Sequence, residues 1–172
     1  MLSDDEVYTQ SMLSRKVNLP IVHIGNRLDS HIRAAVKHMC EGRCVEEGYV
    51  KVDSVRVVSK SCGVALTNHA HVEFHVVFEC MVCYPVEGTE YACYATTITK
   101  AGVTAEIYPS DSLESSKPLV IYIARDHHYN TSEIDEITKN DRIRVRCLGV
   151  RFELNDSFIS AIAEYKGPLD AK

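Results

Sequence analysis

The spacing of apolar residues changes along the chain and divides it into two halves. In the first half, apolar side chains recur at the spacing of one helical face, at Ile32, Ala35, Val36 and Met39. Because Asp29 or Ser30 can cap the start of this segment, we predict a helix over residues 31–40. Alternating and β-branched sequence predicts strands over residues 13–19 and 49–58.

The second half is predicted to consist of short strands. Apolar alternation indicates them over residues 71–86, 91–98, 103–108, 119–124 and 156–165, with two more over residues 141–155 that meet at Gly149. Polar segments rich in Ser, Asp and Asn connect several of these strands. Strands of this length and spacing predict a small barrel or sandwich.

Together the patterns predict an α+β chain of two domains. We expect a flexible tail over residues 1–12, an N-terminal domain over residues 13–82 and a C-terminal β-barrel over residues 83–172. The long strand that begins at His71 lies across the expected boundary. It would therefore connect the two domains.

Composition and charge narrow the classes of function. The chain has 172 residues, of which 45% are hydrophobic and 25% charged, values that are ordinary for a globular protein. Its formal net charge is -5 and neither half is basic, so a nucleic-acid site would have to be a local patch. No stretch approaches the ~18 apolar residues of a membrane span. The first ten residues are acidic and polar, unlike a secretory or mitochondrial leader, so we expect reduced thiols in the cytosol or nucleus.

Two cysteine pairs have spacings that occur among metal ligands. They are Cys40 with Cys44, and Cys80 with Cys83. The second pair falls within a predicted strand, where residues three apart point to opposite faces, so buried thiols are the favoured interpretation. His71 and His75 share one strand face with Glu73, and a solvated face is favoured there over a metal site. No catalytic motif is present, so we expect no metal, no cofactor and no enzymatic activity.

The segment DRIRVRC at residues 141–147 is the strongest candidate for a binding site. Strand alternation places Arg142, Arg144 and Arg146 on one face, and Arg151 follows. Guanidinium groups so close together repel one another unless phosphate or carboxylate groups neutralise them. RNA phosphates are one such partner, with base-stacking side chains offered by Tyr94, Tyr122 and Tyr129. The alternative is neutralisation by carboxylates of adjacent strands, with Glu106 and Glu153 as candidates.

Three segments, taken in order, resemble one protein family. They are EGRCVEEGYVKVDSV from Glu41, HVEFHVVFECMVCYPVEGTEYACYATTITKAGVTAEI from His71, and DRIRVRCLGV from Asp141. The set is similar to the seventh, or stalk, subunit of eukaryotic RNA polymerase II and to its archaeal counterpart, the E subunit. The resemblance covers about residues 13–166. It implies an N-terminal half-ferredoxin-like (truncated RNP-like) domain followed by an S1-type OB barrel.

The resemblance also implies a role. A stalk subunit docks on the polymerase core, at its largest subunit and a sixth-subunit-like region, and binds a small helical fourth-subunit-like partner. The matching docking residues lie in two segments: Ile21, Val22 and Ile24, and then Cys62, Gly63, Val64 and Leu66. The barrel would contact nascent single-stranded RNA or initiation factors.

Departures from the family pattern limit these expectations. Residues 100–104 lack the aromatic side chains of the usual S1 hairpin, which implies weak RNA binding. The segment over residues 59–70, which matches the tip loop of the family, lacks the usual proline. This divergence from the family pattern is expected for a protein of a divergent eukaryote or of a large DNA virus. A eukaryotic protein would be nuclear, and a viral one would be in the virion or a cytoplasmic factory. The competing hypothesis is a free-standing OB-fold module that binds RNA or acts in translation.

Overall fold

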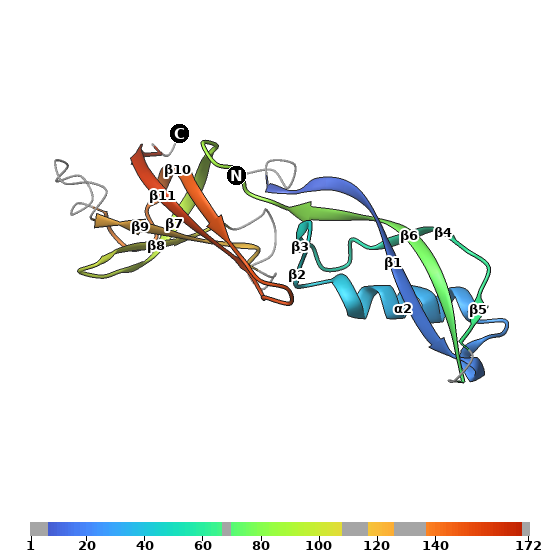
Figure 1. Cartoon of the computed structure of the whole chain (residues 1–172). Helices are drawn as coiled ribbons and strands as arrows, with labels where there is room; N and C mark the ends of the chain where they lie inside the picture. Colours follow the sequence, from blue (N-terminus) through green and yellow to red (C-terminus); the bar gives the residue numbers. More distant parts are fainter. Residues whose placement is uncertain (1–6, 67–69, 108–116, 126–136, 170–172) are drawn as a thin grey trace.

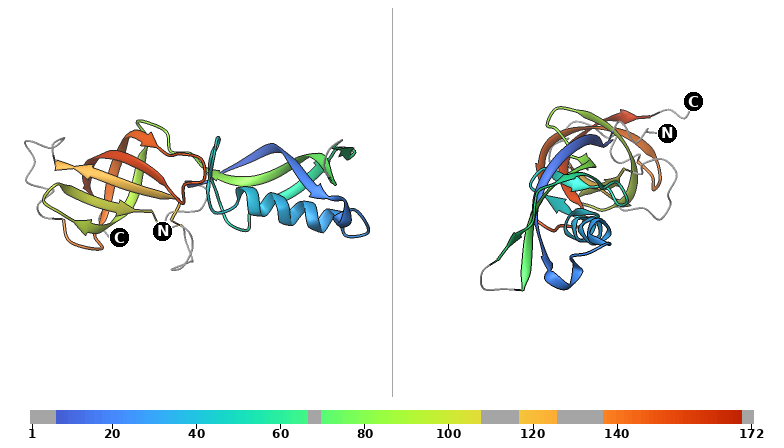
Figure 2. Two further views of the ribbon diagram at one scale, coloured as in Figure 1. Left: turned by 60° about the horizontal axis from the view of Figure 1, so that its bottom comes forward. Right: turned by 90° about the vertical axis from the view of Figure 1, so that its right-hand side faces the viewer.

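The computed structural model describes residues 7–66, 70–107, 117–125 and 137–169. The described chain is mostly β and forms two parts that lie end to end along one axis (Figures 1 and 2). One part is a sheet that is covered by a helix, and the other is a closed barrel. Two clusters of buried apolar side chains correspond to these parts. No helix within the described ranges is long and apolar enough to cross a membrane.

The sheet is built around one long strand, β6 (His71–Cys83). On one side β6 pairs with β1 (Thr9–Pro20) over the whole length of β1. On the other side it pairs in turn with β5 (Val64–Ala65), β4 (Arg56–Lys60) and β3 (Gly48–Val50). The short strand β2 (Cys44–Val45) pairs with β3.

Helix α2 (Leu28–Cys40) lies along the sheet (Figure 2). Its buried residues Ile32, Val36 and Cys40 join the apolar cluster that contains Phe74 and Phe78 of β6. The predicted helix is confirmed, although it begins three residues earlier than the pattern suggested. A 3-10 turn, η1 (Ile21–His23), connects β1 to the segment before the helix.

The barrel consists of five strands. They are β7 (Glu90–Ile98), β8 (Gly102–Glu106), β9 (Leu119–Ala124), β10 (Arg142–Arg151) and β11 (Ile159–Pro168). The strands close in the order β10-β11-β9-β8-β7, so the barrel leaves no open edge. Every strand contributes inward apolar residues, such as Cys93, Ala105, Ile121, Val145 and Ile159. A closed five-stranded barrel is consistent with the predicted OB-like fold.

Three predictions about single segments were wrong. Residues 49–58 are not one strand, because a turn that contains Asp53 at φ 57° separates β3 from β4. Residues 141–155 do not form two strands that meet at Gly149. One strand, β10, passes through Gly149 with a shift of register between Cys147 and Gly149. Residues 9–12 of the predicted tail belong to β1.

The last of these errors has a simple physical cause. Val7 and Tyr8 are 8% and 3% exposed and belong to the apolar cluster of the barrel. Burial of these two side chains fixes the start of β1. Polar neighbours in the sequence concealed this apolar pair.

Candidate nucleic-acid interface and docking tip

The three arginines of β10 have the arrangement that alternation predicts. Ile143, Val145 and Cys147 are buried in the barrel, whereas Arg144 and Arg146 are exposed and Arg142 is half-buried on the outer face. We call Arg142, Arg144 and Arg146 the arginine strip. Tyr94 of β7 lies directly opposite Arg142, so one predicted stacking residue is next to one end of the strip.

The closure of the barrel separates the strip from Arg151. A path from Arg151 to the residue opposite it on each next strand goes once around the barrel and returns to β10 at Arg142. The residues that it crosses on β11, β9, β8 and β7 are Ser160, Val120, Glu106 and Tyr94. The two ends of β10 therefore face different walls of the barrel. The residues predicted as one site therefore lie at two places on the barrel, the arginine strip next to Tyr94 and Arg151 in the same pocket as Tyr122.

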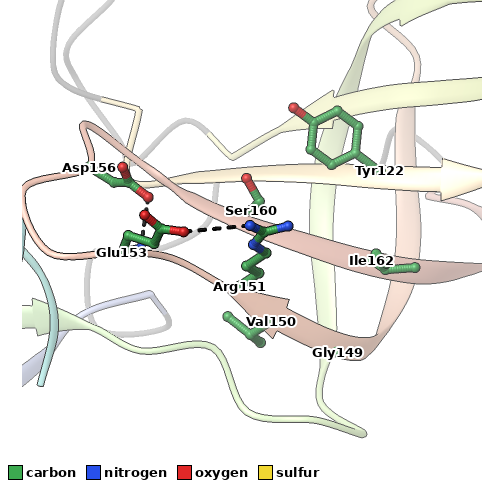
Figure 3. Close-up of a pocket in the computed structure, with 8 residues that line it drawn as sticks. All are labelled: Tyr122, Gly149, Val150, Arg151, Glu153, Asp156, Ser160 and Ile162. Atoms are coloured by element: carbon green, nitrogen blue, oxygen red, sulfur yellow. Dashed lines mark hydrogen bonds and ion pairs between the residues drawn. The ribbon is translucent and has the colours of Figure 1, made fainter. Parts of the chain in front are cut away.

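The second site is an open pocket of about 660 Å³ on the wall formed by β9, β10 and β11 (Figure 3). Its lining residues are Tyr122, Gly149, Val150, Arg151, Glu153, Asp156, Ser160 and Ile162. Tyr122 is 43% exposed. Gly149, Ile162 and Tyr122 occupy adjacent positions on three neighbouring strands, so this part of the wall carries no charged side chain.

Carboxylates accompany the arginines on both walls. A Glu153 oxygen lies 3.5 Å from Nη2 of Arg151 (Figure 3). Glu90 lies opposite Arg146 on β7, and its Oε2 is 3.9 Å from Nε of Arg144. On the other side of the strip, Glu164 lies opposite Arg146 on β11.

The neutralising groups differ in part from those proposed from sequence. Glu153 does contact an arginine, but Glu106 forms an ion pair with Lys117 at 2.7 Å. Glu90 was missed, because only the strand register of the closed barrel reveals which carboxylates flank β10. Glu164 also flanks β10, but its Oε2 lies 2.7 Å from Nζ of Lys166. Tyr129, the third proposed stacking residue, lies outside the described residues.

The two predicted docking segments lie together at the end of the sheet that is farthest from the barrel (Figure 1). The N–H of Ile21 donates to the carbonyl oxygen of Ala70 at 2.9 Å, and the N–H of Leu66 donates to that of His71 at 3.1 Å. Both segments are thereby held at the start of β6. We call this surface the docking tip, defined by Ile21, Val22, Ile24, Cys62, Gly63, Val64 and Leu66.

The docking tip exposes apolar side chains. Val22 is 81% exposed, Val64 is 59% exposed and Ile21 is 57% exposed. Cys62 and Gly63 are also exposed, whereas Leu66 is half-buried. Single exposed apolar residues are common on protein surfaces, but several gathered at one end of a molecule are typical of a contact surface.

The cysteines of the CxxC motif lie in different cores. Cys80 belongs to the cluster of the sheet and Cys83 to that of the barrel. Burial raises the pKa of the Cys80 thiol to about 11 and that of Cys83 to about 12. Both therefore carry protons at neutral pH and pack as small apolar groups. The described part of the chain contains no group of three or more His, Cys, Asp or Glu side chains that could hold a metal ion.

Comparison with known proteins gives one informative similarity. No family model matches the chain. A protein of Acanthamoeba polyphaga mimivirus, named provisionally as a DNA-directed RNA polymerase subunit, is 22% identical over 173 residues. The similar region covers 95% of this chain and 84% of the mimivirus protein. The likeness thus extends over both the sheet and the barrel.

Proposed function

We propose that this chain is a non-catalytic stalk subunit of a multisubunit DNA-dependent RNA polymerase. The observation that carries the proposal is its similarity, along 95% of its length, to a mimivirus protein named as a polymerase subunit. The order of parts supports it, because a sheet domain with an exposed apolar end precedes a closed barrel. We further propose that the sheet domain, which starts with β1 at Thr9 and extends to about residue 82, is half-ferredoxin-like, and that the barrel is of the S1 type.

In this proposal the two ends of the molecule have different tasks. The docking tip packs against the polymerase core, at the largest subunit and a sixth-subunit-like region, because its exposed apolar side chains gain stability from burial. The arginine strip contacts the phosphates of nascent RNA weakly, since Glu90 offsets part of its charge. A fourth-subunit-like partner completes the stalk. A virion or a cytoplasmic viral factory is the location that fits the mimivirus similarity.

A docking variant tests the proposal. The tagged wild-type chain and the Val22→Asp variant would each be expressed in cells that contain the natural assembly. The proteins that co-purify with each would be quantified by mass spectrometry. Val22 is 81% exposed, so Asp should leave the fold intact, whereas burying its charge against a partner would weaken docking at least about tenfold. The matched control is Val52→Asp, an exposed valine in the turn between β3 and β4.

The expected result is recovery of polymerase subunits with wild type and with Val52→Asp, and their loss with Val22→Asp. Equal recovery with a folded Val22→Asp variant would reject the assignment of the docking tip. Absence of polymerase subunits from the wild-type sample would reject the function itself and favour a free-standing OB-fold module.

A further inference from the structure

The outer edge of β1 is the longest strand edge that the described residues leave open. β1 has 12 residues and pairs only with β6 among the described strands. Barrel closure removes the edges of the second part, and β2 at the opposite side of the sheet has two residues. Proteins usually protect such an edge with bulges, prolines or several charges.

β1 has few of these protections. Its register with β6 contains no shift, so no bulge twists the edge away. Pro20 stands only at its end. Among the side chains that face away from helix α2, Lys16 is the single charged one. Arg15, on the other face, donates from Nη1 to the carbonyl oxygen of Ser14 at 2.8 Å, so it covers one carbonyl of this edge.

The register identifies which backbone groups point outward. Opposite residues of an antiparallel pair alternate between those that exchange hydrogen bonds and those that do not. If the register is continued by one residue past Pro20 and His71, Ile21 lies opposite Ala70, and the N–H of Ile21 donates to the carbonyl oxygen of Ala70. This pair is therefore hydrogen-bonded, and by alternation the odd-numbered residues of β1 bond to β6. The even-numbered residues therefore direct their N–H and C=O groups to the open side; these are Gln10, Met12, Ser14, Lys16 and Asn18.

The side chains at these positions indicate which strand would fit. Met12 is 63% exposed, so a partner gains by placing an apolar side chain beside it. The Lys16 ammonium lies 3.1 Å from Glu73 and is still exposed, so it can also contact a carboxylate from a partner. A second copy of this chain fits less well. Antiparallel pairing of two complete β1 edges sets each Lys16 against Met12 of the other copy.

We propose that β1 accepts an extended segment of another polymerase chain as an added strand, with an apolar side chain beside Met12 and an acidic one beside Lys16. The inference rests on the proposed function, which supplies the assembly. Backbone hydrogen bonds to the outward N–H groups of the five positions, and to the outward carbonyl groups other than that of Ser14, would give affinity. The two side-chain contacts would give specificity.

Amide hydrogen exchange on the free chain and on the purified assembly tests the geometry. In the free chain, the amides of Gln10, Met12, Ser14, Lys16 and Asn18 should exchange rapidly and the odd-numbered amides of β1 slowly. In the assembly, the five even-numbered amides should slow at least about tenfold. Continued rapid exchange in an assembly that contains polymerase subunits would overturn the inference and leave the proposed function standing.

A substitution at Ser14 tests the contribution to binding. Ser14→Pro removes one outward N–H at an edge position that tolerates proline, whereas Ser14→Ala keeps this N–H. Both variants should melt at the temperature of the wild type. Ser14→Pro should lower co-purification of the subunit that donates the strand at least about fivefold, and Ser14→Ala should leave it unchanged. Equal recovery with both variants would refute the added strand.

Two other outcomes would also decide against it. If the even-numbered amides exchange slowly in the free chain, and more slowly as the protein concentration rises, a second copy of the chain occupies the edge. If wild type recovers no polymerase subunit, the proposed function and this inference fail together.

Discussion

Substitution of Glu90 tests whether the arginine strip binds phosphate or is a structural ion-pair network. Glu90→Gln removes one negative charge opposite Arg146 and beside Arg144, and preserves the shape of the side chain. If the strip binds RNA, its affinity should rise. If the strip exists only to pair with carboxylates, RNA affinity should stay equally poor and stability should fall.

The structure bounds the size of the effect. The Glu90 and Arg144 atoms are 3.9 Å apart, and both side chains are about half exposed, at 53% and 52%. Two charges at that distance interact by about 1 kcal/mol in water, and measured exposed pairs give ~0.2–1 kcal/mol. RNA affinity should therefore rise at most about fivefold. Three phosphate contacts predict a salt slope of about −2, at ~0.7 for each contact.

Fluorescence titration of a labelled oligonucleotide at several salt concentrations measures both quantities. Arg144→Ser should weaken binding to all sequences equally and reduce the slope by about 0.7. Glu79→Gln makes the same change in net charge, but on β6 in the sheet. This control should leave RNA affinity unchanged, since salt screens distant charges.

The strip would be structural if Glu90→Gln failed to raise the affinity and Arg144→Ser lowered only the melting temperature. An equal rise for Glu79→Gln and Glu90→Gln would mean that net charge, and not the strip, controls binding. Either result would refute the assignment of the RNA site to β10.

Three further predictions concern stability and thiol chemistry. Gly48→Ala should lower the free energy of unfolding by about 1–3 kcal/mol, because φ is +128° and the added Cβ would lie 2.4 Å from the carbonyl oxygen of Cys83. Gly149→Ala, with open space around the new Cβ, is the control, and thermal melting compares them. Burial raises the pKa of Cys93 from 9.0 to about 12, so stability should be constant below pH ~9 and fall as pH rises towards 12, measured by denaturant titration. A maleimide should label Cys62 first in the native protein, since the other six cysteines are buried, and mass spectrometry after proteolysis locates the label.

Periodicity predicted the elements whose amphipathic pattern is uninterrupted. The helical face at Ile32 and Val36 is buried as expected, and β6 and β9 fall within the predicted strands. The errors occur where local backbone geometry decides. A residue at positive φ, Asp53, breaks what looked like one continuous strand. Gly149 looked like a turn, yet the pairing with β11 continues past it.

The candidate site was predictable only in part, for a reason that lies in barrel geometry. Alternation fixes which side chains of β10 point outward, because that depends on one strand alone. Whether Arg151 lies beside Arg142 depends on the stagger of all five strands around the barrel, and no single segment of sequence encodes it. The flanking carboxylate Glu90 was missed for the same reason.

One strand physically couples the two proposed tasks. β6 has 13 residues, which at about 3.3 Å for each residue gives a length of roughly 40 Å. It starts beside the docking tip and ends at Cys83, whose side chain packs in the barrel core.

The junction holds the barrel to the sheet at a second place. The N–H of Cys44 donates to the carbonyl oxygen of Asp156 at 2.8 Å, and the N–H of Asn155 donates to that of Cys44 at 2.9 Å. Buried Tyr49 of β3 also belongs to the barrel cluster. Because backbone hydrogen bonds and shared core residues both cross this junction, docking of the tip would set the direction in which the barrel presents its arginines. A chain with this junction can link a protein contact at one end to an RNA contact at the other.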